Sequence, residues 1–514
     1  MQREAVQGSR NFGGIQIALV VYVLLTGDLL KLVKAALHGV DSSAGLAFAF
    51  AVTMSICLDF LRISPLFFLK GRKEGILHPL IVTVVLWPVL LQLPYLVETL
   101  FSNIGGLTGE AVRTPVFAAL PAASQADVWW GEGFFIVLQL VSLLAIFVGW
   151  RWASGVGGEV HAPRYVWNDS TLRAIAVSFI LLIIGGLVIF LALRGGLQAH
   201  IADLSRGRAR ALEGLGPIVA LFDASTLCLM VWVAIRPKDV RSPLFIGLLI
   251  SVVAVQFISD GSRSSAILVM AKVGLVWALR SGKLPLRLAV FLLPIGLSLF
   301  GALAIIRSSG QTGDTALQAI VSARADQVLD AVQTELEGRR YLSGSAAIVL
   351  EGHEVLDGPL LGQTYLAAVF AFVPRPLWED KPRGAGSMFA QTFLGTTEDG
   401  FAVPIGAVAE AYWNFNVPGV VVLFVLYGFL LRRVHGLYLR RYSDPFVTTF
   451  YVLFLSDFQP GTDSVVPFMQ QATALLLIFL FALAIGARKQ ITPRPGFSSA
   501  VDSDPAFDGR VQLR

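Results

Sequence analysis

Long apolar stretches recur along the whole chain and are separated by short polar connections. A bilayer core takes about 20 residues of α-helix, so each stretch predicts a membrane-spanning helix. The first stretch follows Arg3 and Arg10 and lacks a clear small-residue cleavage site, so we interpret it as a retained span. The pattern therefore predicts an all-α polytopic membrane protein with about twelve transmembrane helices. They are expected at residues 14–36, 44–66, 77–97, 133–150, 174–193, 215–235, 242–259, 264–280, 285–306, 408–431, 445–461 and 467–487.

The composition supports a membrane protein. Hydrophobic residues make up 55% of the chain, charged residues 15%, and mean hydropathy is +0.70, whereas soluble domains carry about 25% charged residues. The two cysteines, Cys57 and Cys228, each lie inside an apolar run, which excludes a disulfide framework and a cysteine metal cluster. We expect no cofactor, no metal and no nucleic-acid partner; the partner indicated at this stage is the lipid bilayer.

Basic residues in the short connections predict the orientation. Alternate connections are rich in lysine and arginine, namely 70–75, 151–173, 236–241, 280–287, 432–441 and the tail from Arg488. The intervening connections at 37–43, 98–132 and 460–466 are nearly free of both residues. Because cytoplasmic loops carry the excess of positive charge, both termini are expected inside (N-in/C-in).

Four regions follow from this topology. Residues 1–306 hold helices one to nine, 307–407 form a large, partly helical outer loop, 408–487 hold helices ten to twelve, and 488–514 form a disordered inner tail. Within the large loop, residues 314–338 have the spacing of an amphipathic helix. The apolar run 364–374 is too short to span, so it is expected to pack against the membrane domain or to enter the membrane and return.

Several arginines are expected on the outer side against the charge trend, which suggests an anionic partner there. Arg263 sits in the shortest outer connection, where it either binds an anion or pairs with Asp260. Arg307 directly follows the ninth span and is either a ligand-binding residue or an interfacial anchor. Arg324 lies on the apolar face of the predicted amphipathic helix, either in a buried ion pair or directed at a ligand.

Four of the charged residues within predicted spans can form pairs; a charge there costs roughly 2.5–3.5 kcal/mol on insertion scales. Asp59 and Arg62 are three residues apart on one helix and can pair. Asp223 and Lys272 can neutralise each other as a structural pair. The alternative is that all four line a polar path through a transporter.

Three short motifs carry a resemblance: "DGSRSS" (260–265), "PRPLWEDKP" (374–382) and "AEAYWNFNVPG" (409–419). Together with the span layout they resemble the bacterial oligosaccharide repeat-unit polymerases, the O-antigen polymerase (Wzy-type) family. The resemblance implies a GT-C-like fold in the bacterial inner membrane with an active site facing the periplasm. It implies transfer of a growing glycan from undecaprenyl diphosphate to a new lipid-linked repeat unit, with a chain-length regulator protein as a further partner. An Arg-x10-Gly pattern of some members is not matched: Arg340 to Gly352 is one residue longer.

This reaction assigns candidate roles to residues. A diphosphate leaves, so cationic side chains must stabilise its charge, and the acceptor hydroxyl needs a base. Glu410 is the first candidate base and His353 the second. The candidate substrate-binding residues are Arg263, Arg307, Arg324, Arg339, Arg340, Arg375, Lys381 and Tyr412. Two other functions stay open, an O-antigen ligase that uses the same donor and a lipid-linked oligosaccharide flippase or transporter.

Overall fold

The fold is described from a computed structural model of the chain. It describes residues 42–69, 77–86, 124–153, 165–206, 215–260, 263–282, 344–370, 381–395 and 405–490, with a few single residues between them. Expectations for the spans at 14–36 and 285–306, the helix at 314–338 and the tail from 491 lie largely or wholly outside these ranges.

Helices dominate the described part of the chain, and six are long and apolar enough to cross a membrane. They lie in α4 (Gly45–Phe68, extended by the turn η2, Ser42–Ala44), α8 (Gln125–Trp152), α9 (Asp169–Leu193), α12 (Gly216–Ile235), α21 (Ala407–Arg440) and α23 (Thr462–Ala484). Six predicted spans coincide with these helices, which confirms an all-α, multi-pass membrane protein. The count of twelve spans stays a prediction.

The remaining helices are shorter or less apolar. Three cover most of a predicted span: α13 (Pro243–Asp260), α14 (Arg263–Ser281) and α22 (Pro445–Asp457). Two more, α5 (Pro79–Ile81) and the π-helical turn η4 (Val82–Leu86), lie in the first part of the span predicted at 77–97. The others are α10 (Leu197–Arg206), the 3-10 turn η7 (Pro237–Arg241), α18 (Gly344–Glu351), α19 (Gln363–Val369) and α20 (Ala385–Leu394). Two short strands, β1 (Tyr165–Trp167) and β2 (Arg488–Gln490), pair antiparallel.

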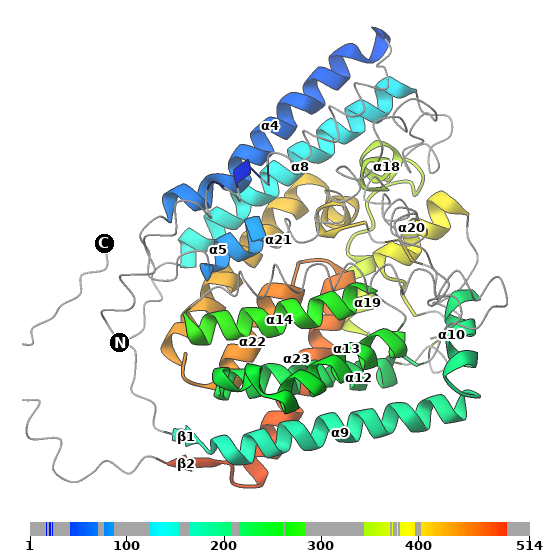
Figure 1. Cartoon of the computed structure of the whole chain (residues 1–514). Helices are drawn as coiled ribbons and strands as arrows, with labels where there is room; N and C mark the ends of the chain where they lie inside the picture. Colours follow the sequence, from blue (N-terminus) through cyan, green and yellow to red (C-terminus); the bar gives the residue numbers. More distant parts are fainter. Residues whose placement is uncertain are drawn as a thin grey trace, which may run out of the picture.

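The helices form two groups (Figure 1). In one, α8 packs between α4 and α21. A Cβ on Gly149 of α8 would collide with the carbonyl of Val425, and one on Gly428 of α21 with that of Ile146. Glycine at these two positions lets the two backbones approach closely, as small residues do where membrane helices pack.

The second group surrounds α12, which contacts α9, α13, α14, α22 and α23. Residues 227–234 of α12, "LCLMVWVA", are all buried. A helix that is apolar all round belongs inside a bundle, so α12 forms the centre of this group.

The described parts of the basic connections at 151–173, 236–241, 280–287, 432–441 and from 488 gather at one end of the bundle, which we call the basic end; the connection at 70–75 lies outside the described residues. The β1–β2 pair lies there beside the start of α9, where Asn168 N–H donates to Ala487 O at 2.8 Å. Arg236 pairs with Asp169 at 3.9 Å, and Arg280 donates to the carbonyl of Tyr442. Connections that the charge pattern assigns to one side of the membrane therefore do lie together, while their orientation in a cell stays a prediction.

The opposite end, which we call the cap end, carries α10, α18, α19 and α20 (Figure 1). His200 of α10 is fully buried there; its Nε2 lies 2.9 Å from Ile258 O and its Nδ1 3.2 Å from Arg194 Nη1. A second apolar cluster, which includes Ile348, Phe389 and Trp413, joins α18 and α20 to the start of α21. The described part of the predicted 307–407 loop thus packs onto the membrane helices.

Candidate functional site

The first turns of α21 end in a break in the helix, and backbone carbonyls at this break bind the segment before α19. Phe415 (φ −139°) and Asn416 (φ 57°, ψ −159°) are non-helical, and Pro418 follows. Because proline has no N–H, the carbonyl of Asn414 has no donor from the helix four residues on. It accepts Leu361 N–H at 3.0 Å instead, and the carbonyl of Trp413 accepts Leu360 N–H at 3.1 Å. The break therefore fixes the segment before α19 to α21.

Glu410 lies one turn before this break and is 1% exposed. Its Oε1 accepts the hydroxyls of Thr364 at 2.7 Å and Thr462 at 2.8 Å, and its Oε2 accepts the N–H of Thr462 at 2.8 Å. Each hydroxyl also accepts a bond, Thr364 from Asn414 Nδ2 at 2.8 Å and Thr462 from Ala385 N at 3.4 Å. Their protons are thus directed at Glu410, an arrangement that suits an ionised carboxylate.

This carboxylate also completes the start of a second helix. The N-cap residue of α23, Gly461, provides no side-chain bond, so Glu410 satisfies the N–H of Thr462 from α21. A Cβ on Gly461 would lie 3.0 Å from Ala407 Cβ and 3.1 Å from Glu410 Oε2. The two helix starts approach this closely because the residue between them is glycine. Positive partial charge at both N-termini favours the anion.

The negative charge of Glu410 is stabilised by hydrogen bonds rather than by a cationic side chain of the described chain. Among the described residues, no lysine, arginine or histidine forms an ion pair with it. Hydrogen bonds and helix ends are the stabilising groups that the described chain supplies. We name Glu410, Thr364, Asn414 and Thr462 the carboxylate cluster.

The second candidate base, His353, follows α18 and packs against another face of α21. Its ring packs against Tyr412 at 5.0 Å, and its Nε2 lies 3.3 Å from Trp413 O. Tyr412 in turn contacts Phe134 at 6.2 Å. Residues 410 and 412 point about 200° apart on a helix, so the structure brings His353 and Tyr412 together but separates their side chains from that of Glu410.

Lys381 lies near this end with its Nζ 2.9 Å from Val373 O. Arg307, Arg324, Arg339, Arg340 and Arg375 lie outside the described residues, so their roles stay predictions. Arg263 begins α14, and its side chain is also outside the described part.

A buried ion pair joins α14 to α22 and α23. Lys272 Nζ lies 2.6 Å from Asp457 Oδ2 and 3.3 Å from Gln471 Oε1. Both α14 and α23 start at the cap end (Figure 1). The backbone of Arg263, the first residue of α14, therefore lies at the same end of the bundle as the carboxylate cluster.

The same pair corrects one interpretation of the span charges. Lys272 pairs with Asp457, at the end of α22, rather than with Asp223. The sequence interpretation missed Asp457 because it lies near the end of a predicted span and far along the chain. The other expected pair is present: Arg62 Nη1 lies 3.5 Å from Asp59 Oδ1, and its Nη2 donates to Gln139 Oε1 at 2.8 Å.

Thr364 and Thr462 were also missed. A single threonine carries no signal in a sequence, and only the packing of α19 and α23 on α21 reveals their role. Within the described ranges, no three His, Cys, Asp or Glu side chains gather as metal ligands. An apolar hollow of about 390 Å³ lies beside Phe134, between α4, α8 and α18. Comparison with protein-family models, curated proteins and solved structures finds no match for this chain.

Proposed function

We propose that this protein polymerises undecaprenyl-diphosphate-linked oligosaccharide repeat units by glycosyl transfer. The observation that supports the proposal is that two of the three motifs lie at one end of the bundle. "AEAYWNFNVPG" supplies Glu410 and Asn414 of the carboxylate cluster, and the arginine of "DGSRSS" begins α14 at the same end. Twelve spans, a GT-C-like arrangement and an inner-membrane location with this end in the periplasm belong to the same proposal.

The chemistry sets what each group must do. An acceptor hydroxyl attacks the anomeric carbon of the growing glycan, the bond from that carbon to the diphosphate oxygen breaks, and undecaprenyl diphosphate leaves with both bonding electrons. Arg263 is the proposed group that stabilises the departing charge, because guanidinium matches phosphate oxygens with paired donors. Glu410 is the proposed base. Three donors occupy its oxygens, two on Oε1 and one on Oε2, so the acceptor position left for a substrate hydroxyl is on Oε2.

The test of the reaction is a product analysis. Purified protein in liposomes receives a lipid-diphosphate oligosaccharide, with and without lipid A core. A ladder of longer glycans on the lipid supports polymerisation. Glycan attached to lipid A core indicates a ligase, and unchanged substrate moved to the other leaflet indicates a flippase; either result contradicts the proposal.

The role of Glu410 needs a readout that separates chemistry from folding. Glu410→Gln is expected to reduce turnover by about 10²–10⁴ and to remove the acidic limb of the rate–pH profile. Thr364→Val keeps the carboxylate and loses one donor, so it should alter stability while keeping that limb. If Glu410→Gln retains near-normal turnover at normal abundance, Glu410 is not the base.

Arg263 has a parallel test in cells. Arg263→Ala is expected to slow transfer by about 10²–10³, because a preorganised donor to the leaving group is lost. Arg263→Lys should stay impaired, since lysine lacks the planar fork. The measurement is the glycan ladder and the pool of single lipid-linked units, with membrane protein level as the control. A normal ladder with Arg263→Ala would contradict the phosphate-binding role and leave pairing with Asp260 as the role of Arg263.

A further inference from the structure

The short helix α19 has an inverted distribution of residues. Thr364, Ala367 and Ala368, at i, i+3 and i+4, are buried. Leu366 and Val369, which belong to the opposite face, are 49% and 65% exposed. A water-facing helix on a protein surface buries its large apolar residues and exposes polar ones. Here small residues face the protein, and Leu366 and Val369 face outward together with Gln363 at the first turn. Small residues inward and large apolar residues outward are the pattern of helices packed inside a bilayer.

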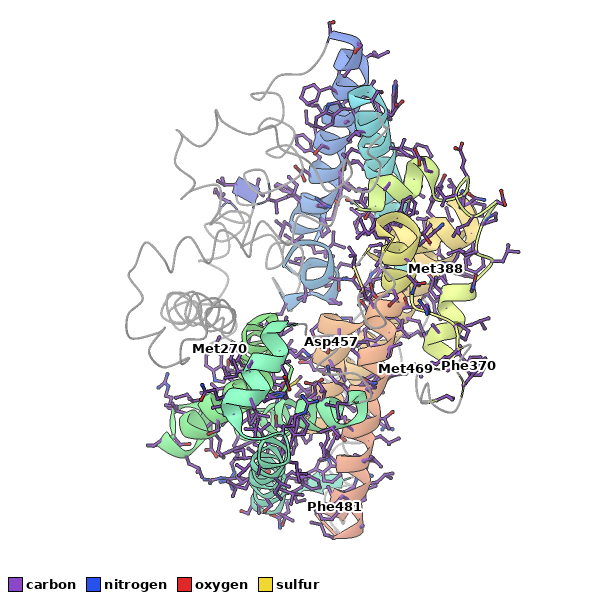
Figure 2. All side chains as sticks on the ribbon, turned by 90° about the vertical axis from the view of Figure 1, so that its right-hand side faces the viewer. Met270, Phe370, Met388, Asp457, Met469 and Phe481 are labelled. Atoms are coloured by element: carbon purple, nitrogen blue, oxygen red, sulfur yellow. The ribbon has the colours of Figure 1, made fainter. Side chains whose placement is uncertain are left out.

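The two spans that α19 packs on also expose large apolar side chains. α19 packs on α23 and the start of α21. Large apolar side chains stay exposed along both spans, at Val417, Val421, Val422, Leu426 and Leu430 of α21 and at Met469, Leu476, Leu477, Leu480 and Phe481 of α23. Figure 2 looks onto the cap end and shows Phe370, directly after α19, at the rim of the bundle, with Asp457 at its centre.

The backbone before α19 also meets a requirement of hydrocarbon, where a free N–H costs several kcal/mol. Leu361 N–H donates to Asn414 O at 3.0 Å, and Gly362 N–H donates to Asn414 Oδ1 at 3.0 Å. Gln363 N–H donates to Leu360 O at 3.0 Å. The irregular turn that leads into the helix is therefore hydrogen-bonded internally rather than left to water.

We propose that α19 is inserted in the bilayer, with Leu366, Val369 and Phe370 in contact with lipid hydrocarbon. A water-exposed position would leave these side chains as an uncovered apolar face beside two spanning helices. The inner face of α19 holds Thr364 against Glu410, so the helix separates the carboxylate cluster from lipid. The cluster then lies below the membrane surface, a placement independent of which reaction the protein catalyses.

Spin labels at matched positions test the insertion. The full-length protein, with Cys57 and Cys228 replaced, receives single cysteines at Leu366 or Val369 and is reconstituted in phosphatidylcholine–phosphatidylglycerol liposomes. Power saturation compares collisions with oxygen, which concentrates in hydrocarbon, and with a water-soluble nickel chelate. Leu476, 53% exposed on α23, is the lipid control, and Glu354, exposed at the cap end, is the water control.

The expected oxygen-to-nickel ratio at 366 and 369 matches that at 476 and exceeds that at 354. A ratio at 366 and 369 on the water side of the midpoint between the two controls overturns the proposal. Low accessibility to both reagents also overturns it, because another copy of the chain would then cover the face. None of these readings depends on glycosyl transfer. A negative result here therefore leaves the proposed function untouched, and a failure of the proposed function leaves the insertion of α19 untouched.

Discussion

The ion pair between Lys272 and Asp457 predicts strongly non-additive mutations. The two side chains are 7% and 10% exposed, and their charged atoms are 2.6 Å apart. At an effective dielectric constant of about 20, Coulomb attraction at this distance is about 6 kcal/mol. Desolvation costs several kcal/mol per ion. The two contributions nearly cancel, so the intact pair adds little net stability over an apolar pair of similar volume.

Removing one partner destroys this balance. Lys272→Met leaves Asp457 as an unpaired buried carboxylate, and Asp457→Leu removes the carboxylate from the buried ammonium of Lys272, which keeps its contact with Gln471. Each single substitution is expected to lower the free energy of unfolding by about 3–5 kcal/mol. The double variant should lie closer to the wild type than either single variant does, because no unpaired charge remains.

The measurement is SDS-induced unfolding in mixed micelles, followed by tryptophan fluorescence, for the four proteins of the double-mutant cycle. Lys238→Met removes a lysine from the exposed basic end and is the control, with an expected change within about 0.5 kcal/mol. If both single variants change stability by under 1 kcal/mol, or if the double variant loses the sum of the two, the buried-pair reasoning is wrong.

Three further results are expected. Gly461→Ala should lower the unfolding free energy by about 1–3 kcal/mol through overpacking, whereas Gly436→Ala, with open space around it, should not; equal effects would contradict the close approach. Burial lowers the pKa of His200 below its ordinary value of 6.5. As the pH falls, the unfolded chain therefore binds a proton at His200 before the folded chain does, and the free energy of unfolding should fall as pH drops through 6.5. His200→Gln should weaken this pH dependence, measured by unfolding at pH 5 to 8, and an unchanged profile would refute it. In intact cells with a permeabilised outer membrane, an impermeant thiol reagent should label a cysteine at Glu354 and not one at Lys238, and the reverse would invert the topology.

The hydrophobic pattern predicts the helices well because each span depends on local composition. Six predicted spans appear as membrane-length helices since about 20 apolar residues satisfy their own backbone wherever they insert. The hydrophobic pattern does not predict which charged residues pair with each other. Asp457 and Lys272 are far apart in sequence, and five carboxylates inside predicted spans were available to pair with the lysine. Which one does so depends on the short length of α22, which ends within the bundle beside α14 and α23.

Glu410 shows how much a predicted site residue can gain from packing. Its place at the start of a span and within a motif predicts importance, but the motif alone favours a base. The structure adds three donors, two helix N-termini and a glycine that admits the carboxylate. A group that orders α19, α20 and α23 around α21 will lower activity when removed, whatever its role in chemistry. A lost product is therefore weak support for a base, and only the rate–pH profile separates proton transfer from assembly of the cluster.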